Sequence, residues 1–566
     1  MTEPESESES ESVEGNTLVV DALTANGVST IYGVVGIPVT DLARTAQDRG
    51  VRYLGFRNEQ AAGHAAAAAG YLTGRPGICL TVSAPGFLNG LVALANATVN
   101  CFPMIQISGS SDRAIVDLEQ GDYEELDQVA TARPFTKAAY RVDSPELIGV
   151  GVGRAIRAAV SGRPGGVYLD LPANVLSASA VRTPPPQIVD PSPRQIPAPE
   201  SVDRAVALLE QARRPLIVLG KGAAYARADA VIRELVEATG APFLPMSMAK
   251  GLLPDDHPQS AAAARSLVLA RADVVVLIGA RLNWLLDHGR PPRWSADARF
   301  IQLDIFATEF DSNRPIEAPV LGDIASSVAA LLAAIRRSRI APVPEWREQI
   351  EASKRANIKR MDAQLHADVH PMDFAVALRA IRDVLDDHRD AIVVSEGANT
   401  LDSARNIIPI YAPRHRLDAG TWGVMGVGLG YAIAAAVETG EPVVAIEGDS
   451  AFGFSGMEIE TICRYKLPVV VIVFNNGGVY RGDEVNAHSD DPAPTVLLHS
   501  SRYDTLIEAF GGIGYHAETP AQVAAALRSA LTTAAPALID CVIDPAVGTE
   551  SGHLQMLNRP AREEEP

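Results

Sequence analysis

Short runs of β-branched and other apolar residues alternate along the chain with longer, alanine-rich segments. Runs of this kind are typical of strands buried on both faces of a parallel sheet, and the segments between them are typical of the covering helices. The pattern occurs in three blocks and predicts an α/β fold with three parallel-sheet domains. The predicted strands are residues 30–35, 77–82, 104–108, 215–220, 272–279, 300–304, 391–395, 442–446, 467–474 and 537–543, and residues 60–71 are predicted to form a packed helix.

Two changes in composition separate the blocks. Residues 183–200 are rich in proline, which fixes φ and lacks a donor, so they are predicted to form an extended linker. Residues 341–368 are charged and weakly apolar and are predicted to form a second linker. The expected parts are an acidic, disordered tail over residues 1–14, domains over 15–182, 201–340 and 369–545, and a C-terminal segment over 546–566.

Composition narrows the class of protein. The 566 residues carry 49 basic and 69 acidic side chains, and a net charge of −20 argues against a general nucleic-acid surface. No apolar stretch approaches the length of a membrane span, and the Glu-Ser repeat at the N-terminus is unlike a signal peptide. We therefore expect a cytoplasmic protein with no membrane or nucleic-acid partner. The four cysteines are scattered, so neither structural zinc nor disulfides are expected.

The most informative chemistry lies after two predicted strands of the last block. Asp449 follows strand 442–446 and Asn476 follows strand 467–474. Taken separately, Gly-Asp-Ser is usually a turn and Asn-Gly is a common hairpin pair. Taken together, both would emerge at the carboxyl edge of one sheet, where α/β proteins bind ligands. A carboxylate, an amide oxygen and the backbone carbonyl of Gly478 would suit Mg²⁺ that also holds diphosphate oxygens.

Two further positions, Glu59 and Met425, become candidates for cofactor contact because the chain also has this motif. Glu59 lies at a predicted strand-to-helix junction, where an acid is most often a helix N-terminal charge. Met425 lies among the glycines of residues 423–428, where a methionine is most often core filler. The alternative in each case is contact with a cofactor.

Distinctive motifs occupy residues 32–38, 81–90, 120–125, 448–465 and 550–552. With the Gly-Asp and Asn-Asn pair, they resemble the oxalyl-CoA decarboxylase family of thiamine-diphosphate-dependent enzymes. The similarity runs from about residue 15 to about residue 558 and includes all three blocks.

The resemblance implies thiamine diphosphate and Mg²⁺ as cofactors. It implies that Glu59 hydrogen-bonds the aminopyrimidine ring and that Met425 supports the bent cofactor. Asn58 stands where the family commonly has histidine. The other residues implied to contact the cofactor are Phe374, Ala398, Asn399, Thr400, Gly423, Val424, Ser450, Ala451 and Tyr480.

The resemblance also implies the substrate site. Tyr123 and Glu124 would lie in the active cleft, Tyr480 would face the reacting centre, and Ser551 would close over the site and assist protonation. His553 stands where the family pattern has arginine. The coenzyme A thioester would be bound, besides Tyr123 and Ser551, by Ile37, Arg265, Asn357, Arg405 and Asn406.

A nucleotide site is expected in the middle block. Residues 220–223, Gly-Lys-Gly-Ala, follow a predicted strand and suit a phosphate, although they lack a full dinucleotide-binding fingerprint. The resemblance implies ADP as an activator there, with FAD not expected. The matching positions are Arg163, Lys221, Arg281, Asp304 and Ile324.

The expected activity is decarboxylation of oxalyl-CoA to formyl-CoA in oxalate catabolism. By resemblance the enzyme would be a homotetramer, a dimer of dimers with active sites at subunit interfaces. Two enzymatic alternatives remain, a 2-hydroxyacyl-CoA lyase and an acetolactate-synthase-like carboligase that uses FAD. The non-enzymatic alternative is an inactive, nucleotide-binding structural homologue.

Overall fold

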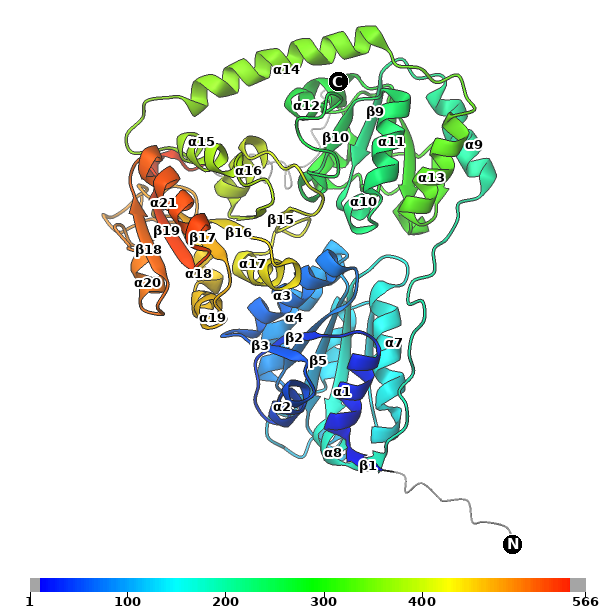
Figure 1. Cartoon of the computed structure of the whole chain (residues 1–566), viewed down its shortest axis with the longest axis vertical. Helices are drawn as coiled ribbons and strands as arrows, with labels where there is room; N and C mark the ends of the chain where they lie inside the picture. Colours follow the sequence, from blue (N-terminus) through cyan, green and yellow to red (C-terminus); the bar gives the residue numbers. More distant parts are fainter. Residues whose placement is uncertain (1–10, 550–566) are drawn as a thin grey trace. The chain divides into compact units, whose positions relative to one another are not determined.

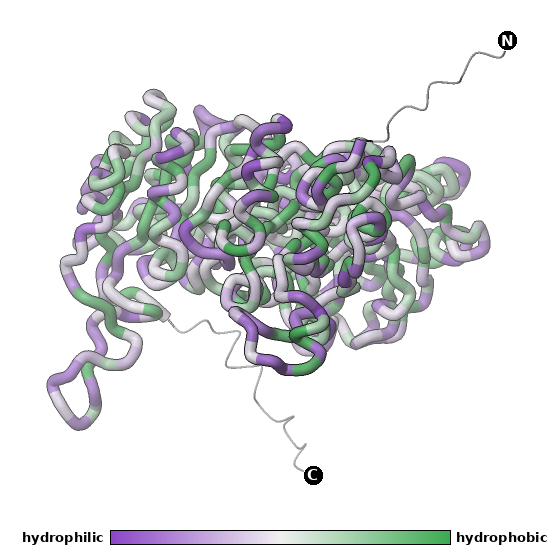
Figure 2. Tube along the Cα trace, turned by 90° about the horizontal axis from the view of Figure 1, so that it is seen from below, coloured by the Kyte–Doolittle hydropathy of each residue, from purple (hydrophilic) through white to green (hydrophobic). Residues whose placement is uncertain are grey.

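The computed structural model describes residues 11–549. The chain divides into two compact units between Pro193 and Arg194 (Figure 1). Hydrophobic stretches alternate with hydrophilic ones along the tube of Figure 2, as expected for strands and helices joined by polar turns.

The first unit contains a six-stranded sheet in the order β3-β2-β4-β5-β7-β6. All neighbouring strands are parallel, as predicted. The strands are β2 (Thr30–Gly33), β3 (Arg52–Gly55), β4 (Gly77–Thr81), β5 (Met104–Ser110), β6 (Ala138–Arg141) and β7 (Gly166–Pro172).

Helices cover both faces of this sheet (Figure 1). On one face α1 (Gly15–Ala25), α2 (Thr40–Asp48) and α7 (Ile148–Val160) form a core with the strands. On the other lie α3 (Glu59–Thr73) and α4 (Pro85–Asn100). Small residues allow α3 and α4 to pack closely, because a Cβ on Gly63 would lie only 2.5 Å from the Ala93 Cβ. The shorter helices are α5 (Arg113–Val116), α6 (Gln128–Ala132) and α8 (Ala173–Ser177).

The predicted disordered tail is wrong at its end. Strand β1 (Ser12–Glu14) pairs antiparallel with β8 (Ser179–Val181). Arg182 extends this pairing, since its N–H donates to the Glu11 carbonyl and its guanidinium binds the carboxylates of Glu11 and Asp21. Main-chain pairing needs no apolar pattern, so an acidic sequence can form this strand.

The second unit contains two sheets, of which the first has the order β10-β9-β11-β12-β13 and is parallel throughout. Its strands are β9 (Pro215–Leu219), β10 (Phe243–Pro245), β11 (Val274–Ile278), β12 (Arg299–Asp304) and β13 (Ala318–Leu321). Its helices are α9 (Pro199–Leu209), α10 (Lys221–Tyr225), α11 (Asp229–Thr239), α12 (Arg265–Arg271) and α13 (Ile324–Ile335).

The predicted second linker is largely one helix, α14 (Pro344–Leu365), which contacts helix α15 (Phe374–Leu385) of the following domain (Figure 1). Only Trp346, Ile350 and Leu365 of α14 are buried, which explains its weakly apolar sequence. The Trp346 Nε1 donates to the Pro215 carbonyl at 3.1 Å, fixing the start of the helix on the middle domain.

The last sheet has the order β15-β14-β16-β17-β19-β18 and is also parallel. Its strands are β14 (Ile392–Glu396), β15 (Arg416–Asp418), β16 (Val443–Gly448), β17 (Val469–Asn475), β18 (Ile513–Ala517) and β19 (Ala537–Val542). Besides α15, its helices are α16 (Ala398–Ile407), α17 (Gly428–Thr439), α18 (Asp449–Ser455), α19 (Glu458–Arg464), α20 (Asp504–Glu508) and α21 (Pro520–Thr533). Within residues 11–549, no helix has both the length and the apolar character needed to span a bilayer.

Candidate cofactor and substrate site

The predicted metal ligands meet at the carboxyl ends of two neighbouring parallel strands. Asp449 directly follows β16, and Asn476 directly follows β17. The Gly477 N–H donates to Asp449 Oδ2 at 2.7 Å, and the Ser450 N–H donates to Asp449 Oδ1 at 2.7 Å. The structure therefore brings together the two turns that the sequence pattern placed at one edge.

Asp449 is only 2% exposed. Burial raises the pKa of its carboxyl to about 6, although backbone N–H groups of Ser450, Gly477, Gly478 and Asn476 oppose the rise. A bound cation would favour the ionised carboxylate. The position thus fits a metal ligand rather than an ordinary exposed turn residue.

The side chain of Asn476 is oriented by its own loop. Its Nδ2 donates to the Tyr480 carbonyl at 2.8 Å, while no hydrogen bond from residues 11–549 reaches its Oδ1. The loop is tightly folded, because a Cβ on Gly482 would lie 2.0 Å from the Asn476 carbonyl. The carboxylate of Asp449, the amide oxygen of Asn476 and the carbonyl of Gly478 fit the hard oxygen ligands of Mg²⁺.

Two helix N-termini converge beside these ligands. Gly397, with φ +96°, precedes α16, and Gly448 precedes α18. A Cβ on Gly397 would lie 3.1 Å from the Gly448 nitrogen, so the two turns are in contact. The N–H groups of the first turn of a helix suit an anion such as a diphosphate. The predicted cofactor residues located in these first turns are Ala398, Asn399, Thr400, Ser450 and Ala451.

The last described residues lie against this site. The Thr549 N–H donates to Asn399 Oδ1 at 3.2 Å, and the Gly482 N–H donates to the Pro545 carbonyl at 2.9 Å. A Cβ on Gly548 would overlap the Tyr480 carbonyl at 1.3 Å. The chain therefore passes directly over the metal loop before residue 550. Ser551 and His553 lie outside the described residues.

Met425 lies in the turn between β15 and α17. The turn has positive φ at Gly423 (+69°) and Gly426 (+89°), and the side chain of Met425 is half-buried. Phe374, predicted to flank the cofactor, begins α15 and packs in the domain core: it is 9% exposed and its ring centroid lies 5.8 Å from that of Phe474.

Glu59, in the first unit, is the first residue of α3. Asn58 is the N-cap of that helix, and its Oδ1 accepts from the Gln60 N–H at 2.8 Å. Asn89 of α4 donates from Nδ2 to Glu59 Oε2 at 3.1 Å. A Cβ on Gly86 would lie 3.2 Å from Glu59 Oε1. One carboxylate oxygen of Glu59 therefore lies close to Gly86, and the other is hydrogen-bonded to Asn89.

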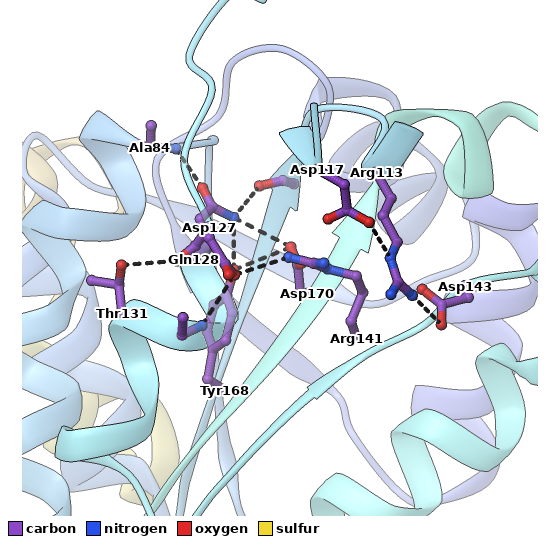
Figure 3. Close-up of polar contacts among 12 residues, drawn as sticks. Ala84, Arg113, Asp117, Asp127, Gln128, Thr131, Arg141, Asp143, Tyr168 and Asp170 are labelled. Carbon is purple, nitrogen blue, oxygen red and sulfur yellow. Dashed lines mark hydrogen bonds and ion pairs between the residues drawn. The ribbon is translucent and has the colours of Figure 1, made fainter. Parts of the chain in front are cut away.

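A buried polar network supports the turn that begins α4 (Figure 3). Gln128 is fully buried; its Oε1 accepts from the Ala84 N–H at 2.5 Å, and its Nε2 donates to the Gly109 carbonyl at 2.9 Å and to the Tyr168 hydroxyl at 2.7 Å. Ala84 has φ +26° and ψ −85°, a conformation that a non-glycine residue adopts only where its surroundings hold it. Asp170, salt-bridged to Arg141 at 2.6 Å, continues the network. Gln128 therefore holds the turn that leads to Gly86 and Asn89.

Tyr123 and Glu124 lie in a turn of the first unit. Tyr123 is 72% exposed, and Glu124 has φ +55°. The Glu125 carboxylate accepts from the N–H groups of Gly121 and Asp122 at 2.8 and 2.9 Å, which fixes the start of the turn. Ile37 of the same unit is also exposed.

Comparison with known proteins agrees with this geometry. Three family models match in chain order: the thiamine pyrophosphate enzyme N-terminal TPP binding domain over residues 13–131, the central domain over 202–331 and the C-terminal TPP binding domain over 396–541. The chain belongs to the thiamine pyrophosphate enzymes. Asp449 and Asn476 lie in the matched C-terminal domain, and Glu59 lies in the matched N-terminal domain.

Relatives within the thiamine pyrophosphate enzymes match almost the whole chain. Oxalyl-CoA decarboxylase of Escherichia coli K12 is 60% identical over 550 residues, covering 96% of this chain and 97% of the relative. The 2-hydroxyacyl-CoA lyase of rice is 47% identical over 572 residues, covering 96% and 98%. The human 2-hydroxyacyl-CoA lyase 1 is 41% identical over 576 residues, covering 97% and 98%.

Four of the residues predicted to bind the coenzyme A thioester lie in the second unit of this thiamine pyrophosphate enzyme: Arg265, Asn357, Arg405 and Asn406. Burial, and then the positive charge of Arg405, lower the pKa of Arg265 to about 10. Asn357 donates to the Ala263 carbonyl at 2.7 Å and so lies beside the start of the helix that begins with Arg265. Asn406 follows Arg405 on α16. This grouping of positive charge suits an anionic ligand such as a phosphate.

The predicted nucleotide residues of the second unit share one sheet edge. Lys221 follows β9, Arg281 lies after β11, Asp304 ends β12 and Ile324 begins α13 after β13. This is the carboxyl edge of the sheet, as expected for an α/β nucleotide site. The fifth predicted residue, Arg163, belongs to the first unit.

Asp504, His516 and Asp540 form a compact group whose ligand atoms lie within 4.8 Å of one another. Their atoms are already used: Asp540 accepts from Asn475 Nδ2 at 3.0 Å and lies 3.0 Å from His516 Nδ1, while Asp504 accepts from Arg502. The group therefore supports the end of β17 rather than forming a metal site.

The sequence alone did not assign roles to Asn89 or Gln128. Asn89 lies in a motif that carried the family resemblance, but its contact with Glu59 joins residues of two different helices. Such a contact has no local sequence signal.

Proposed function

We propose that the protein is a thiamine-diphosphate- and Mg²⁺-dependent oxalyl-CoA decarboxylase that acts in oxalate breakdown. The buried Asp449, hydrogen-bonded to the loop that directly follows Asn476, is the observation that supports a metal-diphosphate site. The 60% identity over 96% of the chain to a relative named oxalyl-CoA decarboxylase supports the choice of acyl group.

In this proposal Asp449, Asn476 and the Gly478 carbonyl hold Mg²⁺, and the first turns of α16 and α18 receive the diphosphate. When bound, thiamine diphosphate supplies the electron sink for the pair released as CO₂ departs. Glu59 would hold a proton toward a nitrogen of the aminopyrimidine ring, and Asn89 donates to the Glu59 carboxylate and so limits its orientation.

The overall reaction consumes oxalyl-CoA and one proton and yields formyl-CoA and CO₂. Arg265, Asn357, Arg405, Asn406 and Ile37 bind the coenzyme A thioester. Positioned groups exclude water and deliver the proton to the carbon that lost CO₂; these groups are Tyr123, Glu124, Tyr480 and Ser551. The chain over residues 545–549 supports the role of Ser551, because it already lies against the Tyr480 loop.

Assembly is part of the proposal. We infer a cytoplasmic homotetramer, a dimer of dimers, in which Glu59 of one subunit completes the diphosphate site of another. ADP would bind as an activator at the carboxyl edge of the middle sheet.

A 2-hydroxyacyl-CoA lyase is the second candidate, favoured by relatives of that name at 47% and 41% identity. The same cofactor site would serve that reaction, so substrate decides between them. Glu59, Asp449 and Asn476 are all present, which weighs against an inactive homologue. A carboligase that uses FAD would be yellow when purified, and a colourless protein would exclude it.

The test is incubation of the pure protein with thiamine diphosphate, Mg²⁺ and oxalyl-CoA, with a parallel reaction on a 2-hydroxyacyl-CoA. Formyl-CoA from oxalyl-CoA is the expected product. Cleavage of only the 2-hydroxyacyl-CoA would favour the lyase, and no product from either, with cofactor bound, would overturn both proposals.

A further inference from the structure

Two glutamates lie side by side in the core beneath the Met425 turn. Glu396 ends β14 and is paired in register with Glu447 of the neighbouring strand β16. Both are buried, at 1% and 0% exposure. A buried acid needs hydrogen bonds to offset its lost hydration. The hydrogen-bond partners of each glutamate therefore indicate which part of the structure it stabilises.

Only Glu396 has hydrogen bonds to the turn. Its Oε1 accepts from the Gly426 N–H and its Oε2 from the Gly428 N–H, both at 2.5 Å. Burial raises the pKa of Glu396 to about 7, and the N–H groups of residues 426–428 oppose that rise. Gly428 begins α17, whose N-terminus favours an anion. Neither carboxylate oxygen of Glu447 has a hydrogen-bond partner among residues 11–549.

The space beside the two acids requires glycine. A Cβ on Gly428 would lie 2.1 Å from Glu447 Oε1 and 2.9 Å from Glu396 Oε2. A side chain at this position would collide first with the Glu447 carboxylate and would also crowd the Glu396 carboxylate. Glycine at residue 428 thus leaves room for both carboxylates.

The other end of the turn is held separately. Arg281 donates to Thr421 Oγ1 at 3.2 Å, and the Trp284 Nε1 donates to the Thr421 carbonyl at 2.9 Å. Met425 therefore lies between two anchors, Thr421 on one side and the Glu396-bound N–H groups on the other. The second anchor directly adjoins Met425.

We propose that Glu396 is a positioning residue for the cofactor: by accepting from Gly426 and Gly428 it fixes the turn on which Met425 supports thiamine diphosphate. This inference rests on the proposed function. Glu447 has no hydrogen bond to the turn and fills space beside Glu396.

The matched pair of variants is Glu396→Gln and Glu447→Gln. An amide at 396 offers one oxygen and one N–H₂ group, so it cannot accept from both N–H groups. At saturating Mg²⁺, calorimetry should show that Glu396→Gln weakens thiamine diphosphate binding about tenfold or more. At saturating cofactor without substrate, its exchange of the cofactor C2 proton with deuterium, followed by NMR, should also be slower. Glu447→Gln keeps the side-chain volume, and both measurements should stay within about threefold of the wild type.

The outcomes separate the two proposals. If the wild type does not bind thiamine diphosphate with Mg²⁺, the proposed function fails. If the wild type binds but Glu396→Gln matches it in affinity and in exchange rate, or Glu447→Gln is equally impaired, the positioning role is wrong. Should Glu396→Gln not fold, Glu396→Asp serves instead, because it keeps the charge while its shorter side chain draws the carboxylate away from the N–H groups of Gly426 and Gly428; unchanged binding and exchange there would equally overturn the role.

Discussion

Asp449 Oδ2 accepts from the Gly477 N–H at 2.7 Å, joining the turns that follow two neighbouring strands. This bond links the acid of one motif to the loop of the other, although the two residues lie far apart in sequence. It also places the carboxylate against the backbone of the loop that begins at Asn476. The proposed metal site depends on this relationship more than on either motif alone.

Asp449→Asn should abolish Mg²⁺-dependent binding of thiamine diphosphate. An amide carries no charge and presents N–H₂ to a donor, so affinity should fall by more than about 100-fold. Calorimetry with and without Mg²⁺ measures the loss. Asp323→Asn is the control, because Asp323 caps α13 by accepting from the Ser326 N–H and asparagine caps equally well. Equal losses in both variants would refute a metal-specific role.

Asn89→Ala should slow the reaction without preventing cofactor binding. It removes the donor to Glu59, an interaction with a charged group that is worth about 1.5–3 kcal/mol. We expect kcat to fall about tenfold or more while the KM for the substrate changes little. Asn26→Ala is the matched control, since the Asn26 side chain donates to the carbonyls of Ala22 and Pro186 and accepts from the Ile188 N–H, all backbone groups. A normal kcat in Asn89→Ala would mean that Glu59 needs no such support.

Arg265→Ala should raise KM for a coenzyme A thioester about tenfold, with kcat largely kept. The half-buried guanidinium would lose its attraction to the phosphates, but it does not act on the reacting carbon. Arg271→Ala removes an exposed arginine at the end of the same helix and should leave KM unchanged. Steady-state kinetics on both variants separate a local role from a general charge effect; equal KM values would contradict the assignment.

His64 should make the protein less stable in acid. It is fully buried on α3, and burial lowers its pKa to about 3. In the unfolded chain the imidazole titrates near 6.5, so between these values the unfolded state binds the additional proton. The contribution is complete above pH 6.5 and is lost as pH falls.

The measurement compares wild type with His64→Gln by chemical denaturation at pH 7 and pH 5. The penalty of the substitution should shrink by about 2 kcal/mol at the lower pH, because glutamine does not titrate. A penalty independent of pH would show that His64 is not held neutral.

The parallel sheets could be predicted because their strands are continuous apolar runs covered by helices. The predicted strands of all three sheets are present, including β17, whose residues are all buried. Helix α14 was predicted as a linker because only Trp346, Ile350 and Leu365 of its residues are buried. Strand β1 was missed because its pairing uses the main chain and carries no apolar pattern.

The candidate cofactor site could likewise be predicted only where its residues follow a local sequence pattern. Asp449 and Asn476 could be predicted from strand ends, since parallel neighbours bring those ends together. The contacts of Glu59 with Asn89, and of Glu396 with Gly426, cross between elements, and each joins polar side chains or backbone groups without a local pattern. Only the fold reveals such contacts.

Direct product analysis tests the central claim. Pure protein saturated with thiamine diphosphate and Mg²⁺ is given oxalyl-CoA, and formyl-CoA and CO₂ are quantified together. We predict equal amounts of both products and none with Asp449→Asn. Bound cofactor in the wild type without formyl-CoA would contradict the account.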